Sequence, residues 1–237
     1  MSPFFGEFFG TAIIILLGGG VVANVSLDKT YGHKGGWIVI TFGWAIAVFC
    51  GVLLAAPISG AHLNPAVTLA LVLVDKFSPE LMPLYILAQL LGAMFGAGLV
   101  WLAYKKHFDA TADGDAKKAV FCTAPSIRSY GYNILTELIG THMLTMAVLY
   151  MAAPEVGLGA LNALPIAFVV LGIGLSLGGA TGYAINPARD LGPRIVHHFL
   201  PIPNKSSSDW KYAWVPILGP TLGAISAAVL FLILKSL

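Results

Sequence analysis

The chain has 237 residues, of which 57% are hydrophobic and only 10% are charged, with a net charge of +2 and a mean hydropathy of +0.84. Soluble domains carry about 25% charged residues, so this composition excludes an ordinary soluble protein and predicts an integral membrane protein with one membrane-embedded domain. The small net charge gives no indication of a nucleic-acid partner, and Cys50 and Cys122 provide neither a disulfide framework nor the spacing of a metal site.

Six apolar segments are predicted to cross the membrane. Inside a bilayer the polar backbone groups must be satisfied within the segment itself, so each is expected to be a helix of about 20 residues. The predicted spans are Phe4–Val25, Trp37–Ala56, Leu81–Tyr104, Gly131–Met151, Leu161–Leu177 and Tyr212–Leu234.

Two further apolar runs, Pro65–Val74 and Pro187–Phe199, are too short to span. At about 1.5 Å per residue they reach only about half-way through a hydrocarbon core about 30 Å thick. Each run follows an asparagine, Asn64 or Asn186. Asn is a good N-cap and Pro suits the first helical position. Each run is therefore predicted to be a re-entrant half-helix, with free N–H groups and the positive end of the helix dipole inside the membrane.

The two halves of the chain repeat the same motifs. An odd number of spans per unit, three, means that the second copy is expected to lie inverted in the membrane. We predict one domain over residues 1–237, with repeat one over about 1–104, a polar loop over about 105–130 and repeat two over about 131–237. The matched motifs are Glu7-x-x-Gly10-Thr11 with Glu137-x-x-Gly140-Thr141, Asn64-Pro65-Ala66 with Asn186-Pro187-Ala188, and Gly92-x-x-x-Gly96-Ala97 with Gly219-x-x-x-Gly223-Ala224, at offsets of 130, 122 and 127 residues.

The paired Asn-Pro-Ala motifs, the inverted repeat and the matched glutamates resemble the aquaporin (major intrinsic protein) superfamily over essentially the whole chain. The resemblance implies an all-α membrane protein with six transmembrane helices and two re-entrant half-helices. It also implies a pore in each subunit, a homotetramer in the plasma membrane, and cytoplasmic termini. The charge pattern argues the other way, because nine of the thirteen basic residues would then lie in outer loops. We take the orientation from the family.

Within this superfamily the chain resembles the glycerol-facilitator branch of bacterial type. Residues typical of that branch are Asp190, Arg194 and the pair Pro216-Ile217. The resemblance also implies a constriction built from four side-chain positions. In this sequence they are Trp44, Gly174, Tyr183 and Arg189.

The chemistry of these positions suits a small polar solute. Arg189 offers several donors and no acceptor, so it can hold a hydroxyl or carbonyl oxygen and repel cations; a salt bridge to Asp190 is the structural alternative. Trp44 and Tyr183 would form an aromatic corner for the CH face of a polyol. Water-selective relatives typically carry His where this chain has Gly174, and Gly is expected to leave room for a three-carbon solute.

Two departures from the family pattern leave the preferred solute open. Tyr183 stands where glycerol facilitators usually have Phe, and Gly179 where the pattern usually has Pro. Tyr183 would add a hydroxyl at the constriction, and Gly179 would make the loop that carries it more pliable.

Three ionisable side chains inside the membrane have more than one interpretation. Glu7 and Glu137 are candidates for a proton relay, as intramembrane carboxylates are by default. The resemblance implies instead that each accepts N–H groups from its re-entrant loop. His62, beside the first motif, is a packing or pore-side group and a candidate pH-sensitive site at the inner mouth.

We therefore predict a passive channel for glycerol and other small uncharged solutes that also conducts water. Two half-helix N-termini at the midplane would exclude protons and other cations. The alternative solutes are urea and undissociated lactic acid, and the rival from another class is a proton-coupled transporter using Glu7 or Glu137. No nucleotide loop or nucleophile–base arrangement is apparent, so we expect neither enzymatic activity nor a cofactor or metal. The expected partners are small neutral solutes and membrane lipid.

Overall fold

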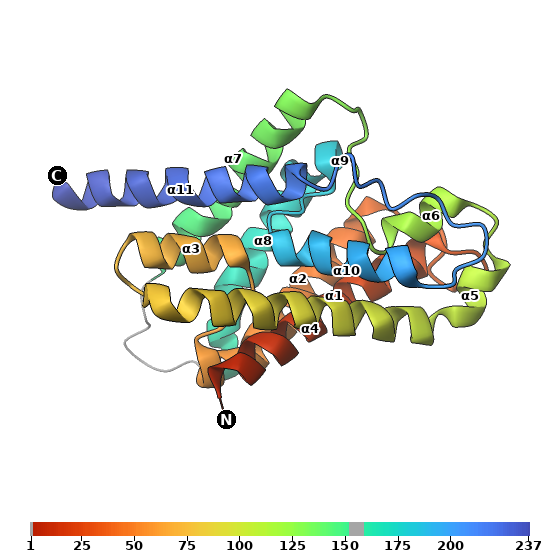
Figure 1. The fold of residues 1–237 in the computed structure, drawn as a ribbon, viewed down its shortest axis with the longest axis horizontal. Coiled ribbons are helices and arrows are strands. Elements are labelled where there is room, and N and C mark those ends of the chain that lie inside the picture. Colours follow the sequence, from red (N-terminus) through yellow and green to blue (C-terminus); the bar gives the residue numbers. More distant parts are fainter. Residues whose placement is uncertain (1, 152–158) are drawn as a thin grey trace.

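The computed structural model describes residues 2–151 and 159–237, and within these ranges the chain is built from helices and contains no strand. Figure 1 shows the helices gathered into one bundle. The longer helices are α1 (Pro3–Ser26), α2 (Trp37–Ser59), α4 (Met82–Ala103), α7 (Tyr130–Tyr150), α8 (Leu164–Ser176) and α11 (Val215–Ser236). The half-helices and connecting turns are α3 (Pro65–Leu73), α5 (Lys105–Ala110), α6 (Gly114–Ala119), α9 (Gly178–Thr181) and α10 (Pro187–Phe199), with 3-10 turns η1 (Pro79–Leu81) and η2 (Gly159–Ala163).

Helices at the six predicted positions differ in how strongly they indicate a membrane span. Within the described residues, α1, α2, α4 with its preceding turn, and α11 are long and apolar enough to cross a membrane. The helix α7 has the length but is more polar, since it carries Glu137 and His142. The helix α8 is shorter than predicted because the 3-10 turn η2 occupies its expected first residues.

The two halves of the chain pack in the same way. The helix α1 packs against α2 and α4, and α7 packs against α8 and α11. The halves are joined where α2 contacts α8, α3 contacts α11 and α10 contacts α4. Within each half, glycines allow the close approach of α4 to α1 and of α11 to α7. A Cβ on Gly92 would lie 2.2 Å from Phe8 O, and one on Gly223 would lie 2.5 Å from Leu138 O. This is the small-residue packing that membrane helices use.

Both predicted half-helices are present with the predicted start. The helix α3 begins at Pro65 and ends one residue earlier than predicted, and α10 has the predicted bounds. The caps are those expected from the sequence. Asn64 Oδ1 accepts from Ala66 N at 2.9 Å, and Asn186 Oδ1 accepts from Ala188 N at 3.0 Å.

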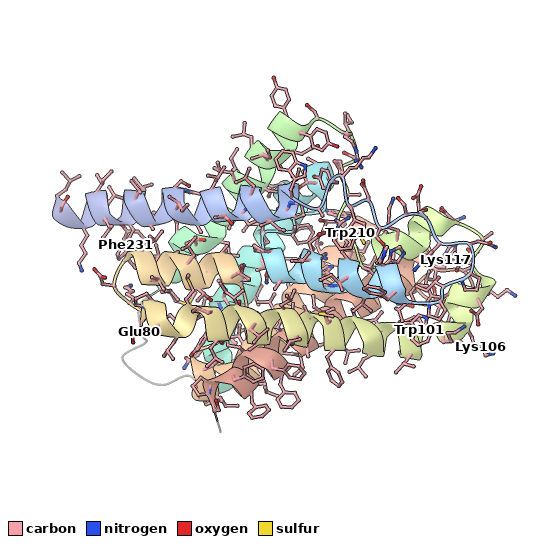
Figure 2. The ribbon with its side chains drawn as sticks, in the orientation of Figure 1. Glu80, Trp101, Lys106, Lys117, Trp210 and Phe231 are labelled. Atoms are coloured by element: carbon pink, nitrogen blue, oxygen red, sulfur yellow. The ribbon has the colours of Figure 1, made fainter. Side chains whose placement is uncertain are left out.

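The predicted polar loop over about 105–130 contains two short helices, α5 and α6, that we did not predict. The helix α6 is capped by Asp113, whose carboxylate accepts from Asp115 N at 2.8 Å. Figure 2 shows Lys106 and Lys117 at this end of the bundle and Glu80 at the opposite end. Both chain ends lie toward the end away from α5 and α6 in Figure 1.

Candidate functional site

The two half-helices meet at their N-terminal ends. Asn64 Nδ2 donates to Ile185 O at 2.8 Å, and Asn186 Nδ2 donates to Leu63 O at 2.8 Å. Each asparagine therefore caps its own helix through Oδ1 and fixes the opposite loop through Nδ2. Each amide nitrogen keeps a second hydrogen with no acceptor among the described residues, available to a solute oxygen.

The loops leading into the half-helices have matching strained backbones. In the first loop Ala61 and Leu63 have φ values of 55° and 51°, and in the second Tyr183 and Ile185 have φ values of 35° and 42°. Residues with a side chain rarely adopt this left-handed region. Such strain persists only where the surroundings impose it, and it is typical of functional sites.

Glu7 supplies much of that constraint for the first loop. Its Oε1 accepts from Ser59 Oγ at 2.7 Å and from His62 N at 3.0 Å. Its Oε2 accepts from Leu63 N and from Gln89 Nε2, both at 2.7 Å. Four donors converge on one fully buried carboxylate, which supports the anchoring role that the resemblance implies.

Glu137 holds the second loop in the same way but with fewer bonds. Its Oε1 accepts from Thr181 Oγ1 at 2.6 Å and from Ala184 N at 3.0 Å, and its Oε2 accepts from Ile185 N at 2.8 Å. By the 127-residue offset, the residue at the position of Gln89 is Pro216, which has no side-chain donor. Gln89 could not be identified from the sequence, because its role follows only from its burial beside Glu7.

Two cavities meet at three of the predicted constriction residues. One cavity of about 200 Å³ lies beside Asn64 and Asn186, and a second of about 460 Å³ lies beside α6; they are called here the inner and the outer cavity. Both are bordered by Trp44, Tyr183 and Arg189. The guanidinium carbon of Arg189 lies 3.9 Å from the centroid of the Trp44 ring. The inner cavity is bordered by the two strained loops and by apolar side chains, among them Ile14, Val48, Val67, Leu144, Val148 and Val170.

The salt bridge between Arg189 and Asp190, which we considered as an alternative, is not formed. Asp190 is bound by Arg194 instead, through Nε to Oδ1 at 2.7 Å and Nη2 to Oδ2 at 2.8 Å. Asp190 Oδ2 also accepts from Thr123 N at 2.8 Å. The Arg189 guanidinium has no hydrogen-bond acceptor among the described residues, so its donors are available to a solute.

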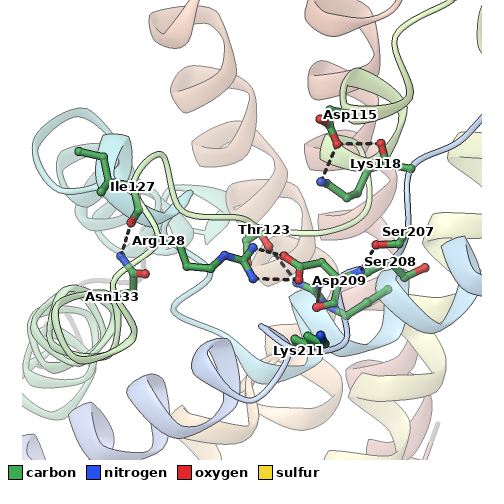
Figure 3. Close-up of polar contacts among 12 residues, drawn as sticks. Asp115, Lys118, Thr123, Ile127, Arg128, Asn133, Ser207, Ser208, Asp209 and Lys211 are labelled. Carbon is green, nitrogen blue, oxygen red and sulfur yellow. Dashed lines mark hydrogen bonds and ion pairs between the residues drawn. The ribbon is translucent and has the colours of Figure 1, made fainter.

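Arg194 ties the second half-helix to the loops around it. Its Nη1 donates to Ser208 O at 2.6 Å and its Nη2 to Thr123 O at 2.8 Å. Figure 3 shows the neighbouring contact in this region, in which Arg128 reaches Asp209. Asp190 and Arg194, the residues typical of the glycerol-facilitator branch, therefore hold Thr123 at the edge of the outer cavity, and neither of them borders that cavity.

Gly174, one of the four predicted constriction residues, lies against the Tyr183 ring. It borders neither cavity, and a Cβ there would lie 3.0 Å from Tyr183 Cζ and 3.0 Å from Thr41 Cγ2. Its carbonyl accepts from Trp37 Nε1 at 2.9 Å. The space that glycine leaves is thus filled by the Tyr183 ring, whose hydroxyl is buried without a partner among the described residues.

The remaining predicted site residues have simple placements. A Cβ on Gly179 would meet nothing within 4 Å, so this position is open. Pro216 is buried and Ile217 is 36% exposed, and neither borders a cavity. His62 borders the inner cavity. Within the described residues, no group of three or more His, Cys, Asp or Glu side chains is placed to hold a metal ion.

Comparisons with known proteins agree with this architecture. The major intrinsic protein family matches residues 1–231. A probable glycerol uptake facilitator protein of Thermotoga maritima is 56% identical over 231 residues and 98% of each chain. The glycerol uptake facilitator protein of Bacillus subtilis is 49% identical over 98% of this chain and 84% of its own. The X-ray structure of the aquaglyceroporin from Plasmodium falciparum matches with a TM-score of 0.85 and 33% identity, over 96% of this chain and 93% of that chain. The predicted aquaporin fold is confirmed, and the chain belongs to the major intrinsic protein family.

Proposed function

We propose that this chain is a passive membrane channel for glycerol and other small uncharged solutes, with water also passing. The observation that carries the proposal is the meeting of the inner and outer cavities at Trp44, Tyr183 and Arg189. Arg189 supplies hydrogen-bond donors for solute hydroxyls. The aromatic rings and the apolar wall of the inner cavity suit the CH face of the same molecule. The names of the relatives point to glycerol as the first solute to test.

The same arrangement opposes cations. The N-termini of α3 and α10 face each other through Asn64 and Asn186, so the positive ends of two helix dipoles lie at one place. Arg189 adds a full positive charge close by, next to Trp44. A hydronium or metal ion therefore meets a positive potential, whereas a neutral polyol does not.

The solute is identified by stopped-flow light scattering on proteoliposomes, with sucrose as the impermeant control. We expect fast re-swelling in glycerol. Shrinkage by water loss without glycerol re-entry would show a water channel. Fast entry of urea, or of lactic acid below its pKa, with slow glycerol entry would move the assignment to that solute.

We expect one duplicated pore unit per chain, a homotetramer, contact with membrane lipid and placement in the plasma membrane with cytoplasmic termini. Large apolar side chains cover the outside of the bundle, including Phe42, Ile46 and Phe168, which supports burial in lipid or against further subunits. Native mass spectrometry of the detergent-solubilised protein tests the homotetramer. Protease access to the C-terminus in intact cells tests the orientation of the termini.

A further inference from the structure

Trp37, the first residue of α2, is held in a way that does not fit an ordinary membrane anchor. A partly exposed tryptophan at a helix end usually stands at the membrane–water interface, with its N–H group on the wet side. Trp37 is 39% exposed, but its Nε1 donates to Gly174 O on α8, 2.9 Å away. The polar end of the side chain is therefore bound by the other half of the chain.

The indole ring of Trp37 also packs against Tyr183. The two ring centroids lie 5.7 Å apart with an angle of 77° between the ring planes, which is an edge-to-face pair. Trp37 borders the outer cavity but not the inner one, whereas Tyr183 borders both. Trp37 therefore restrains Tyr183 from the side of the outer cavity.

Two glycines four residues apart, Gly174 and Gly178, provide the place that the Tyr183 ring occupies. A Cβ on Gly174 would lie 3.0 Å from Tyr183 Cζ, and also 3.0 Å from Cγ2 of the fully buried Thr41. A Cβ on Gly178 would lie 2.8 Å from Trp37 Cζ2 and closer still to Tyr183 Cδ1. The tyrosine ring thus lies against the two glycines, and Trp37 packs beside it.

One face of α2 carries both Trp37 and a residue of the constriction. Positions 37, 41 and 44 are separated by four and three residues, so they lie on the same face of a helix. Trp44 borders both cavities together with Tyr183 and Arg189. The same helix face therefore supplies one aromatic side chain of the constriction and the residue that restrains the other.

We propose that Trp37 is a positioning residue for Tyr183 and thereby sets which polyols pass the constriction. The bond to Gly174 O fixes the indole, and the edge of the indole keeps the tyrosine ring in its place. Tyr183 has a φ of 35°, a conformation that persists only where the surroundings impose it. This inference deepens the proposed function and rests on it, because it concerns discrimination among solutes at the same constriction.

The test compares the permeability of glycerol with that of erythritol, a four-carbon polyol, in proteoliposomes. Trp37→Leu removes both the aromatic ring and the N–H donor, so the Tyr183 ring gains room on the side of the outer cavity. We expect the glycerol-to-erythritol permeability ratio to fall about two- to tenfold, the scale of one lost aromatic pair. A residue that only stabilised the fold would lower both permeabilities together and leave their ratio unchanged.

Trp214→Leu is the matched control. Trp214 stands at the N-cap of α11, is 43% exposed, and donates from Nε1 to Lys211 O at 3.1 Å. It borders neither cavity. The control removes the same kind of side chain and the same kind of bond, and it should leave the ratio at the wild-type value.

Further variants show whether Trp37 acts through Tyr183. In a Tyr183→Leu background the ring that Trp37 restrains is gone, so adding Trp37→Leu should change the ratio there by less than about twofold. Trp37→Phe keeps an aromatic side chain but has no donor, and its ratio should lie between those of wild type and Trp37→Leu. If Trp37→Leu does not fold, Trp37→Phe takes its place in both comparisons.

An unchanged or raised ratio in the Trp37 variant, or an equal fall in Trp214→Leu, overturns the proposal. An undiminished effect in the Tyr183→Leu background also overturns it, because Trp37 would then act on the solute directly. Wild-type protein that admits no glycerol would overturn the proposed function, and this inference with it. Wild-type protein that admits glycerol, with no selective effect at Trp37, overturns this inference alone.

Discussion

Tyr183 and Gly174 show how one residue's role depends on another's size. Glycine at position 174 was predicted to leave room for a three-carbon solute, and the tyrosine ring lies close to where a side chain at this position would be. The width at the constriction is therefore set by where this ring sits. A change at Gly174, outside both cavities, should act on the solute path through Tyr183.

Gly174→Ala should slow glycerol several-fold while leaving the protein folded. The new methyl would lie 3.0 Å from Tyr183 Cζ, so the ring has to shift by a few tenths of an ångström. Gly172→Ala is the matched control on the same helix, since a Cβ there would meet nothing within 4 Å. Stopped-flow glycerol permeability of the two variants checks this, and equal values for both would contradict it.

The unpaired hydroxyl of Tyr183 gives a second prediction. Because this buried group has no partner among the described residues, Tyr183→Phe should leave stability unchanged or raise it by up to about 1 kcal/mol. The aromatic ring at the constriction remains, so glycerol permeability should persist. Thermal unfolding in detergent with parallel flux measurements tests this. A clear loss of stability would mean that the hydroxyl is paired in the protein.

Among the elements, the two re-entrant loops depend on their glutamates. Glu7→Gln and Glu137→Gln each place an amide N–H₂ or a weaker acceptor against main-chain donors, and each should lower stability by about 2–3 kcal/mol. Glu7→Gln should have the larger effect, since its carboxylate accepts four bonds and that of Glu137 three. Unfolding midpoints of the two variants and of the wild type measure both losses of stability. Unchanged stability together with lost proton-driven uptake would establish a relay instead.

A contact between the loop before α7 and the loop before α11 depends on pH. The hydrogen bond from Arg128 lowers the pKa of Asp209 below its ordinary value. A carboxyl with a depressed pKa stabilises the fold above its unfolded pKa of about 4 and loses this contribution as the pH falls through the folded pKa. Wild type should exceed Arg128→Gln in stability by up to about 1 kcal/mol at neutral pH, because the pair is partly exposed. Melting curves at several pH values should show this difference vanish well below pH 4.

Local chemistry explains which elements could be predicted. Asn64-Pro65 and Asn186-Pro187 specify a cap and a first helical residue by themselves, so the half-helices followed directly from the sequence. The partners of Glu7 could not be predicted in this way. Gln89 is 82 residues from Glu7 in the sequence and reaches its carboxylate only through the packing of α4 on α1. The helices α5 and α6 were missed because a polar, charged segment carries no apolar periodicity.

At the scale of the molecule, the two half-helices lie tip to tip. The offsets between repeated motifs indicated this arrangement, and the reciprocal bonds of Asn64 and Asn186 show it. The relation between Gly174 and Tyr183 was beyond sequence reasoning, since it depends on how α8 packs beside the second loop. The path for a solute is a property of both halves together, because Trp44 comes from the first and Arg189 from the second.

Passive passage of a neutral solute without protons distinguishes a channel from a proton-coupled transporter. One measurement tests it directly: glycerol entry into proteoliposomes by light scattering, with a pH-sensitive dye inside the same vesicles. We predict fast glycerol equilibration down its gradient with no change in internal pH, and no accumulation when a pH gradient is imposed. Glycerol entry accompanied by proton movement, or glycerol accumulation driven by the pH gradient, would contradict it.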